Sequence, residues 1–164
     1  MGRWKPPAEK SSPYITPAGF AVLEQELKDL WLRRRDVVIA LAAAAAEGDR
    51  SENAEYHYRK KELGGIDRRI RYLQKRIPDL NIVRESPSTE RVFFGAWVML
   101  ENEADGSETQ YRIVGADEAD AKQKLISMDS PMAKALLQKN LDDEVKLNTK
   151  DKQSIFYITG IRYE

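Results

Sequence analysis

The sequence contains no cysteine and a single histidine, His57. Without cysteine the chain cannot form disulfides, use a thiolate nucleophile or bind zinc through sulfur. A histidine with no second histidine or cysteine beside it also argues against a metal or catalytic role for His57. The missing cysteine fits the reducing cytosol, so we predict a cytoplasmic protein.

The chain also lacks net charge and long apolar runs. Its 27 basic and 27 acidic residues cancel, so any electrostatic function must be local. No apolar run approaches the ~20 residues that a membrane span needs, and we expect no membrane contact. Residues 1–13 hold prolines but no apolar segment, which predicts a flexible leader and not a signal peptide.

Two long segments show the spacing of apolar residues that is typical of coiled coils. Apolar or small residues alternate at intervals of three and four from Phe20 to Ala44, and again from Tyr56 to Ile77. A short polar segment, residues 48–53, separates them. Two helices with matching seams and a tight connection must fold back on one another. Residues 14–80 are therefore predicted to form an antiparallel helical hairpin with its tip at 48–53.

Local signals fix the ends of these helices. Thr16-Pro17 predicts the start of the first, with a hydroxyl at the N-cap and a proline at the first helical position. The second is expected from about Glu52 to Ile77, where Pro78 stops it. Inside it, Gly64-Gly65 predicts a local softening but no break, because the apolar seam continues in register beyond the glycines.

The second half of the chain changes to the alternating pattern of strands. Residues 81–90 are predicted to be a linker. Strands are expected over 92–100, 110–114, 125–128, 144–148 and 154–163, with one helix from Ser130-Pro131 to about Gln138. Residues 91–164 therefore form a small antiparallel sheet with one helix, and the chain as a whole belongs to the α+β class.

Asp49 and Glu52 at the tip admit two interpretations. Asp-x-x-Glu at a helix start is the spacing of a capping box, in which both side chains serve the first helical turn. Alternatively, the two carboxylates make an incomplete Mg²⁺ site, because this ion prefers six oxygen ligands. Such a pair could complete the coordination of a metal that a partner already holds.

The second helix carries charge mainly of one sign. Between Tyr56 and Arg76 there are eight basic and two acidic residues. Lys61, Arg68 and Lys75 are expected to point away from the seam. This face is either a solvated surface or a contact for a polyanion, and nucleic acid is the polyanion that it suits best. Ser130-Pro131 is in the same way either a simple helix cap or part of a contact surface.

Four segments resemble the bacterial Gre transcript-cleavage factors, and in particular their GreB type: EGDRSENAEYHYRKK (47–61), IDRRIRYL (66–73), VFFGAWV (92–98) and MDSPMAKALL (128–137). The resemblance covers residues 14–164 in order. It implies an N-terminal coiled-coil hairpin followed by an FKBP-like domain. It also implies a transcription elongation factor that enters the secondary channel of RNA polymerase and stimulates endonucleolytic cleavage of backtracked RNA.

The resemblance assigns roles to particular residues. It places Asp49 and Glu52 on the tip acids that share the Mg²⁺ of the polymerase active centre, which is the only metal implied. The basic patch facing the 3′ end of the nascent RNA would be Lys60, Lys61, Arg68 and Arg69. Docking at the channel rim, on the β′ subunit, would fall to Asp129, Ser130 and Pro131. The chain itself would be no enzyme, and we expect a monomer.

Two further functions were weighed against this one. The chain could be a channel-binding regulator of polymerase that does not promote cleavage. An FKBP-like domain could also suggest prolyl isomerase activity, but a fold does not carry a function with it.

Overall fold

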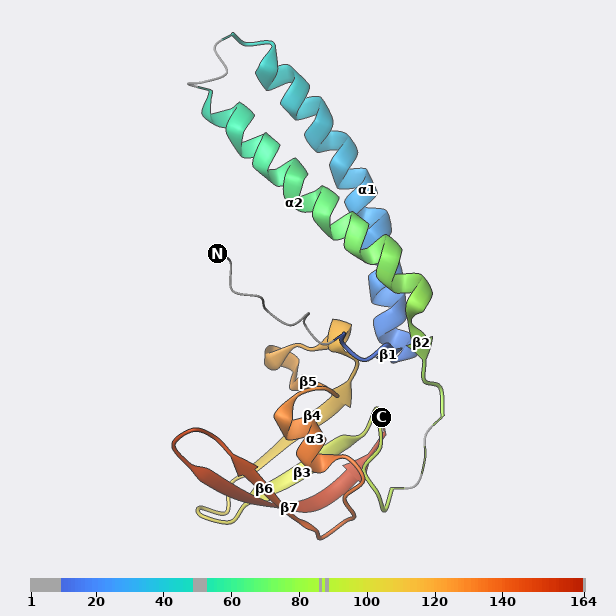
Figure 1. The fold of residues 1–164 in the computed structure, drawn as a ribbon, viewed down its shortest axis with the longest axis vertical. Coiled ribbons are helices and arrows are strands. Elements are labelled where there is room, and N and C mark those ends of the chain that lie inside the picture. The colour runs from blue at the N-terminus through green and yellow to red at the C-terminus, as the bar shows by residue number, and fades with distance from the viewer. Residues whose placement is uncertain (1–9, 49–52, 86, 88, 164) are drawn as a thin grey trace, which may run out of the picture. The chain divides into compact units, whose positions relative to one another are not determined.

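The structure is a computed structural model that describes residues 10–48, 53–85, 87 and 89–163. The chain divides into two compact units (Figure 1). The hairpin unit comprises Phe20–Leu80, and the sheet unit comprises Met1–Gly19 with Asn81–Glu164. The tip acids Asp49 and Glu52 lie outside the described residues. No helix in the described ranges is long and apolar enough to cross a membrane.

Two antiparallel helices make the hairpin unit, as the apolar spacing predicted (Figure 1). They are α1 (Pro17–Ala45) and α2 (Ala54–Arg76), and α2 is followed by a 3₁₀ turn, η1 (Ile77–Asp79). Their seam is thin. Its central cluster is formed by Val37, Ile66 and Ile70, with Leu27, Leu30 and Leu63 packed against it. The predicted hairpin is therefore confirmed, although α2 begins two residues after the predicted start.

The Gly64-Gly65 pair does not interrupt α2. Each glycine costs about 1 kcal/mol relative to alanine in a helix interior. No packing contact requires them, because a Cβ built on Gly64 or Gly65 would meet only the guanidinium of Arg68, at 3.4 Å and 3.8 Å. Neither glycine adopts a positive φ. The pair is thus a local cost in helix stability that the fold of the hairpin does not explain.

The sheet unit is built on five strands in the order β5-β4-β3-β7-β6. The elements are β3 (Trp97–Asn102), β4 (Glu108–Val114), β5 (Leu125–Ser127), α3 (Pro131–Leu136), β6 (Glu144–Asn148) and β7 (Gln153–Arg162). Three pairings are antiparallel, but β4 and β5 are parallel. The prediction of an antiparallel sheet is corrected here, because β4 and β5 are joined by a crossover through 3₁₀ turns and pair in parallel. The α+β class is confirmed.

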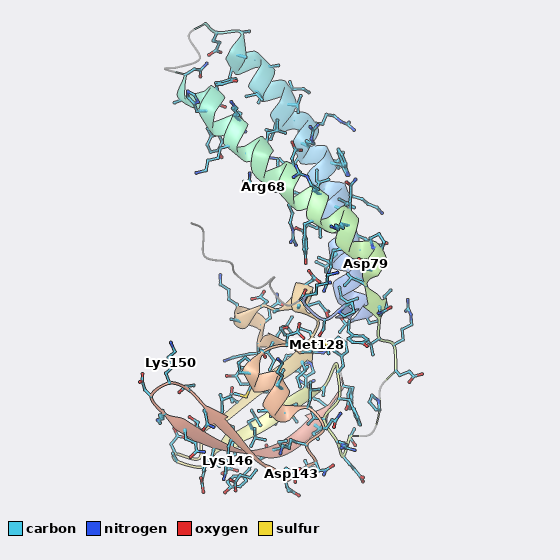
Figure 2. All side chains as sticks on the ribbon, viewed as in Figure 1. Arg68, Asp79, Met128, Asp143, Lys146 and Lys150 are labelled. Atoms are coloured by element: carbon cyan, nitrogen blue, oxygen red, sulfur yellow. The ribbon has the colours of Figure 1, made fainter. Side chains whose placement is uncertain are left out.

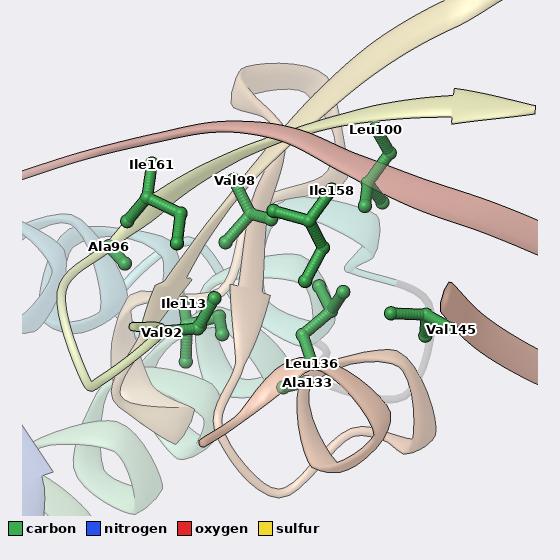
Figure 3. Packing of buried hydrophobic residues seen from close by; sticks show 10 residues of the cluster. All are labelled: Val92, Ala96, Val98, Leu100, Ile113, Ala133, Leu136, Val145, Ile158 and Ile161. Atoms are coloured by element: carbon green, nitrogen blue, oxygen red, sulfur yellow. The ribbon is translucent and has the colours of Figure 1, made fainter. Parts of the chain in front are cut away.

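The core of the sheet unit lies between the sheet and α3. Val98 and Leu100 of β3 and Ile158 of β7 point toward Leu136 of α3 (Figure 3). All four side chains are completely buried. Apolar burial of this kind is worth about 25 cal/mol per Å² and stabilises the unit.

Two short strands connect the first chain segment of the sheet unit to the second. β1 (Tyr14–Ile15) pairs in parallel with β2 (Asn81–Ile82). Residues 81–90 were predicted to be a linker, so β2 is a difference from that prediction. A two-residue strand is too short to show a period in the sequence.

Glu118 caps the start of α1 together with Thr16. Its carboxylate accepts hydrogen bonds from the Thr16 hydroxyl, from Thr16 N at 3.0 Å and from Gly115 N at 2.8 Å. The Thr16 hydroxyl oxygen in turn accepts from Gly19 N at 3.1 Å, which confirms the predicted N-cap. A Cβ on Gly19 would lie 2.0 Å from Glu118 Oε1, so the close approach requires glycine.

Candidate functional site

The turn between α1 and α2 carries the predicted tip acids. Because Asp49 and Glu52 lie outside the described residues, their geometry is not part of the structure. Gly48, which precedes them, has a φ of 115°, a conformation that favours glycine. Asn53, which follows them, is the N-cap of α2. Residues 49–52 thus connect two well-defined helix ends.

Asn53 holds the two helices together beside the tip. Its Oδ1 accepts a hydrogen bond from Tyr56 N at 3.0 Å, and its Nδ2 donates to the carbonyl of Ala44 at 2.7 Å. One side chain therefore caps α2 and bonds the last turn of α1. The sequence analysis did not single out this residue, although asparagine is among the preferred N-caps and precedes the periodic segment directly.

The position of Asn53 bears on the first of the two interpretations of the tip acids, the capping box. A capping box at Asp49 and Glu52 would start the helix directly after Asp49. The structure starts α2 at Ala54 and caps it with Asn53. The N-cap of α2 is therefore Asn53 and not Asp49.

Three of the four predicted basic-patch residues are exposed on α2. Lys60, Lys61 and Arg68 are all exposed, and within the described ranges no acidic side chain pairs with them. Arg68 lies midway along the helix (Figure 2). Arg69 differs, because its guanidinium bonds both carboxylate oxygens of Glu26 on α1, at 2.7 Å and 3.0 Å. It links the helices, so its charge is partly neutralised.

Arg59 of α2 is also paired, with two acids of its own helix. Its guanidinium lies 2.8 Å from Glu55 and 3.4 Å from Glu62. The hydrogen bond with Glu55, with the charge of Glu62 adding to it, raises the pKa of Arg59 above its ordinary value. The charge of Arg59 is therefore neutralised within its own helix. Lys60, Lys61 and Arg68 differ from it, because no acidic side chain of the described residues pairs with them.

The predicted docking residues lie at the start of α3. The Ser130 hydroxyl accepts from Ala133 N at 3.2 Å, and Pro131 occupies the first turn, so the predicted cap is confirmed. The Asp129 carboxylate accepts hydrogen bonds from the hydroxyl of Ser12 and, at 2.8 Å, from its backbone N. The end of the predicted leader is thus bonded to the first of the three docking residues, a long-range contact that no local pattern signals.

The described part of the chain offers no metal site of its own. None of its residues form a group of three or more histidine or carboxylate side chains that could hold an ion. Asp49 and Glu52, three residues apart, would supply two carboxylates, which is fewer ligand groups than a complete Mg²⁺ site needs.

Family models match nearly the whole chain. The model of the N-terminal part of transcription elongation factors matches residues 13–82. The model of the C-terminal part of the elongation factors GreA and GreB matches residues 87–163. The two matches meet close to the boundary between α2 and the second segment of the sheet unit.

Relatives of known name agree with the family models. The transcription elongation factor GreB of Xanthomonas axonopodis pv. citri is 56% identical, over 99% of this chain and 98% of the relative. GreB of Pseudomonas aeruginosa is 50% identical over the same shares. The crystal structure of GreA factor homolog 1 of Thermus thermophilus matches with 27% identity and a TM-score of 0.42, over 91% of this chain and 97% of that one. On the family models and the sequence relatives, this chain belongs to the GreA/GreB family of transcription elongation factors.

Proposed function

We propose that this chain enters the secondary channel of RNA polymerase, hairpin tip first, and stimulates endonucleolytic cleavage of backtracked nascent RNA. A transcription elongation factor of this family is not itself a catalytic enzyme, and it implies interaction with RNA polymerase. The observation that carries the proposal is the cap of α2. Because Asn53 is the N-cap of that helix, we give Asp49 and Glu52 a role toward a partner and not in the cap.

The hairpin is also long enough to carry its tip carboxylates far from the start of α1. α1 contains 29 residues, and at 1.5 Å per residue it is about 44 Å long. Asp49 and Glu52 would give two carboxylates to the Mg²⁺ of the polymerase active centre, where metal ions stabilise the attacking and leaving oxygens of phosphodiester hydrolysis. The two carboxylates would reach that centre only while the hairpin is bound, so docking would switch the activity on.

The remaining predicted residues would position the complex. Lys60, Lys61 and Arg68 carry unneutralised charge that suits the phosphates of the extruded RNA. Asp129, Ser130 and Pro131 would dock on the β′ subunit at the channel rim. Pro131 is exposed at the first turn of α3, which supports this role. The protein would act as a monomer in the cytoplasm.

The test is transcript cleavage on a stalled, backtracked polymerase. The double variant Asp49→Asn, Glu52→Gln keeps the size and polarity of both side chains but removes their charge. We expect cleavage to slow at least about tenfold, because a hydrogen bond or ligand contact of a charged group is worth ~1.5–3 kcal/mol. Glu47→Gln is the matched control, since Glu47 is an exposed acid in the same turn and is predicted to have no role.

The polymerase affinity of each variant is measured in parallel. If the double variant binds normally and cleaves at the wild-type rate, the metal role is wrong. The remaining function would then be that of a channel-binding regulator without cleavage activity. In that case only a change at the docking residues, such as Pro131→Ala, would abolish the effect on polymerase.

A further inference from the structure

The basic residues of the hairpin include two groups, those that form ion pairs between the helices and those on the outer face of α2. Arginines near α1 are paired: Arg33 with Glu62 at 2.8 Å, Arg34 with Asp67 at 2.7 Å, and Arg69 with Glu26 at 2.7 Å. These pairs use Glu26 of α1 and Glu62 and Asp67 of α2. Across the described part of the hairpin, the basic residues of α2 that keep no acidic partner are Lys60, Lys61, Arg68, Arg71 and Lys75.

Two tyrosines lie on the same stripe as these charges. Tyr58 and Tyr72 are 59% and 42% exposed. With Lys61, Gly65, Arg68 and Lys75 they recur at alternating intervals of three and four residues, which places all six on one side of the helix. The tyrosines are fourteen residues apart, or about 21 Å at 1.5 Å per residue. Electrostatic steering alone would not require aromatic rings at either end of a basic stripe.

Each of these rings is held by an arginine that a carboxylate fixes in turn. Arg59 lies 5.4 Å from the ring centroid of Tyr58 and is bonded to Glu55. Arg69 lies 5.3 Å from the ring centroid of Tyr72 and is bonded to Glu26. Tyr58 and Tyr72 thus stay 59% and 42% exposed while an arginine lies against each ring. A ring that is held in place in this way loses little entropy when a planar group stacks on it.

The glycine pair lies between the two tyrosines. At Gly64 and Gly65 the helix surface has no side chains, and only the guanidinium of Arg68 lies close to it. A guanidinium is planar, and nucleobases stack on such planes. At the two glycines no other side chain of the described residues lies within 4 Å of the position that a Cβ would take, so the space beside this guanidinium is open.

We infer that this stripe binds a single-stranded nucleic acid through its bases as well as its phosphates. Tyr58, Tyr72 and the Arg68 guanidinium over Gly64-Gly65 are the stacking surfaces, and Lys61 and Lys75 meet the phosphates. Stacking on aromatic side chains tolerates any sequence, because every base has a flat face. The inference rests on the proposed function only in naming the extruded transcript as the natural strand.

Binding of the full-length protein without polymerase tests this inference. The probes are a fluorescent twelve-residue oligoadenylate RNA and a sugar–phosphate strand of equal length without bases, both at low salt. We expect the RNA to bind at least about fivefold more tightly than the abasic strand, since stacking is worth ~1–3 kcal/mol per base. Equal affinities, or no binding of either strand, would overturn base stacking.

Variants locate the stacking surfaces. Tyr58→Leu with Tyr72→Leu is expected to remove most of the preference for bases and to leave binding of the abasic strand unchanged. Tyr14→Leu is the control, because Tyr14 is also 42% exposed but belongs to the sheet unit. A double variant that binds the RNA as tightly as the wild type would contradict the inference.

The double variant Gly64→Ala, Gly65→Ala separates a change in RNA binding from a change in the stability of the hairpin. Both changes favour the helix, so the hairpin should become more stable. A Cβ at either position would meet the Arg68 guanidinium only at ordinary contact distances, 3.4 Å and 3.8 Å, so the preference for bases should persist. A fall in this preference, in a hairpin that is more stable, would contradict the assignment of stacking to Tyr58 and Tyr72. The tip variant Asp49→Asn, Glu52→Gln should bind both strands normally, so failure of the cleavage proposal remains distinguishable from failure of this one.

Discussion

The two units of this chain are stabilised in different ways. The sheet unit buries a contiguous apolar core between its sheet and α3, with Leu100, Leu136 and Ile158 fully enclosed. The hairpin unit has a narrow seam and adds ion pairs between its helices, such as Arg69 with Glu26. A two-helix unit needs only one side of each helix for packing. The difference teaches that the outer side of α2 is available for charge and for function.

The largest loss of stability is expected in the sheet unit, from Leu136→Ala in α3. Leu136 is fully buried, and truncation of a buried leucine costs about 2–5 kcal/mol through lost transfer free energy and the cavity left behind. Urea denaturation should show this loss in the sheet unit, while the helical signal of the hairpin changes little. Leu141→Ala, at a leucine that is 41% exposed, should cost less than about 0.5 kcal/mol. Similar losses in both variants would mean that the core is not close-packed.

A smaller effect is expected in the hairpin from Asn53→Ala. The change removes the N-cap of α2 and the bond to Ala44, and a lost cap costs about 1 kcal/mol. Hydrogen exchange should report faster opening of the last turn of α1 and the first turn of α2. Asn53→Asp keeps the accepting oxygen but not the donor, so it separates the cap from the link to α1. Unchanged exchange in both variants would show that the clamp contributes nothing.

The smallest effect concerns pH and the sheet unit alone. Partial burial raises the pKa of Tyr163, whose hydroxyl donates to the carbonyl of Arg91 at 2.8 Å and accepts from Phe93 N at 3.2 Å. The folded state therefore prefers the neutral phenol. Its contribution is complete below the ordinary pKa of about 10 and is lost as the pH rises through the higher folded value. Tyr163→Phe should flatten the fall in stability above pH 10, measured by urea denaturation.

A second tyrosine provides the check on that experiment. The pKa of Tyr157 is also raised, first by loss of solvent and then by the charge of Glu103. Part of the alkaline slope should therefore persist in Tyr163→Phe and disappear when Tyr157→Phe is added. If the slope is identical in the wild type and the double variant, these two hydroxyls do not control alkaline stability.

Periodic signals in the sequence predicted the elements well. The interval of three and four residues predicted the hairpin, and Thr16-Pro17 and Ser130-Pro131 predicted helix starts that the structure confirms. Strand β6 was predicted with its observed bounds. These features depend on neighbouring residues only, so they can be read along the chain.

What the sequence did not reveal depends on partners far apart in the chain. The parallel pairing of β4 with β5, the cap that Glu118 provides for Thr16 and the bond of Ser12 to Asp129 join residues that no local pattern relates. On α2 the basic patch was predicted as one surface, but Arg69 is bonded to Glu26 on α1. A helical projection predicts the direction in which a side chain points, but not the acidic residue with which it forms an ion pair.

The pairing of β1 with β2 has a consequence for how this protein can be altered. Because Tyr14–Ile15 and Asn81–Ile82 lie side by side, the polypeptide departs from the sheet unit and returns to it at neighbouring points. In topological terms residues 20–80 are an insertion within one continuous domain. The insertion should be removable, with a short glycine bridge from Gly19 to Asn81 in its place. A hairpin from another relative should be exchangeable at the same two points.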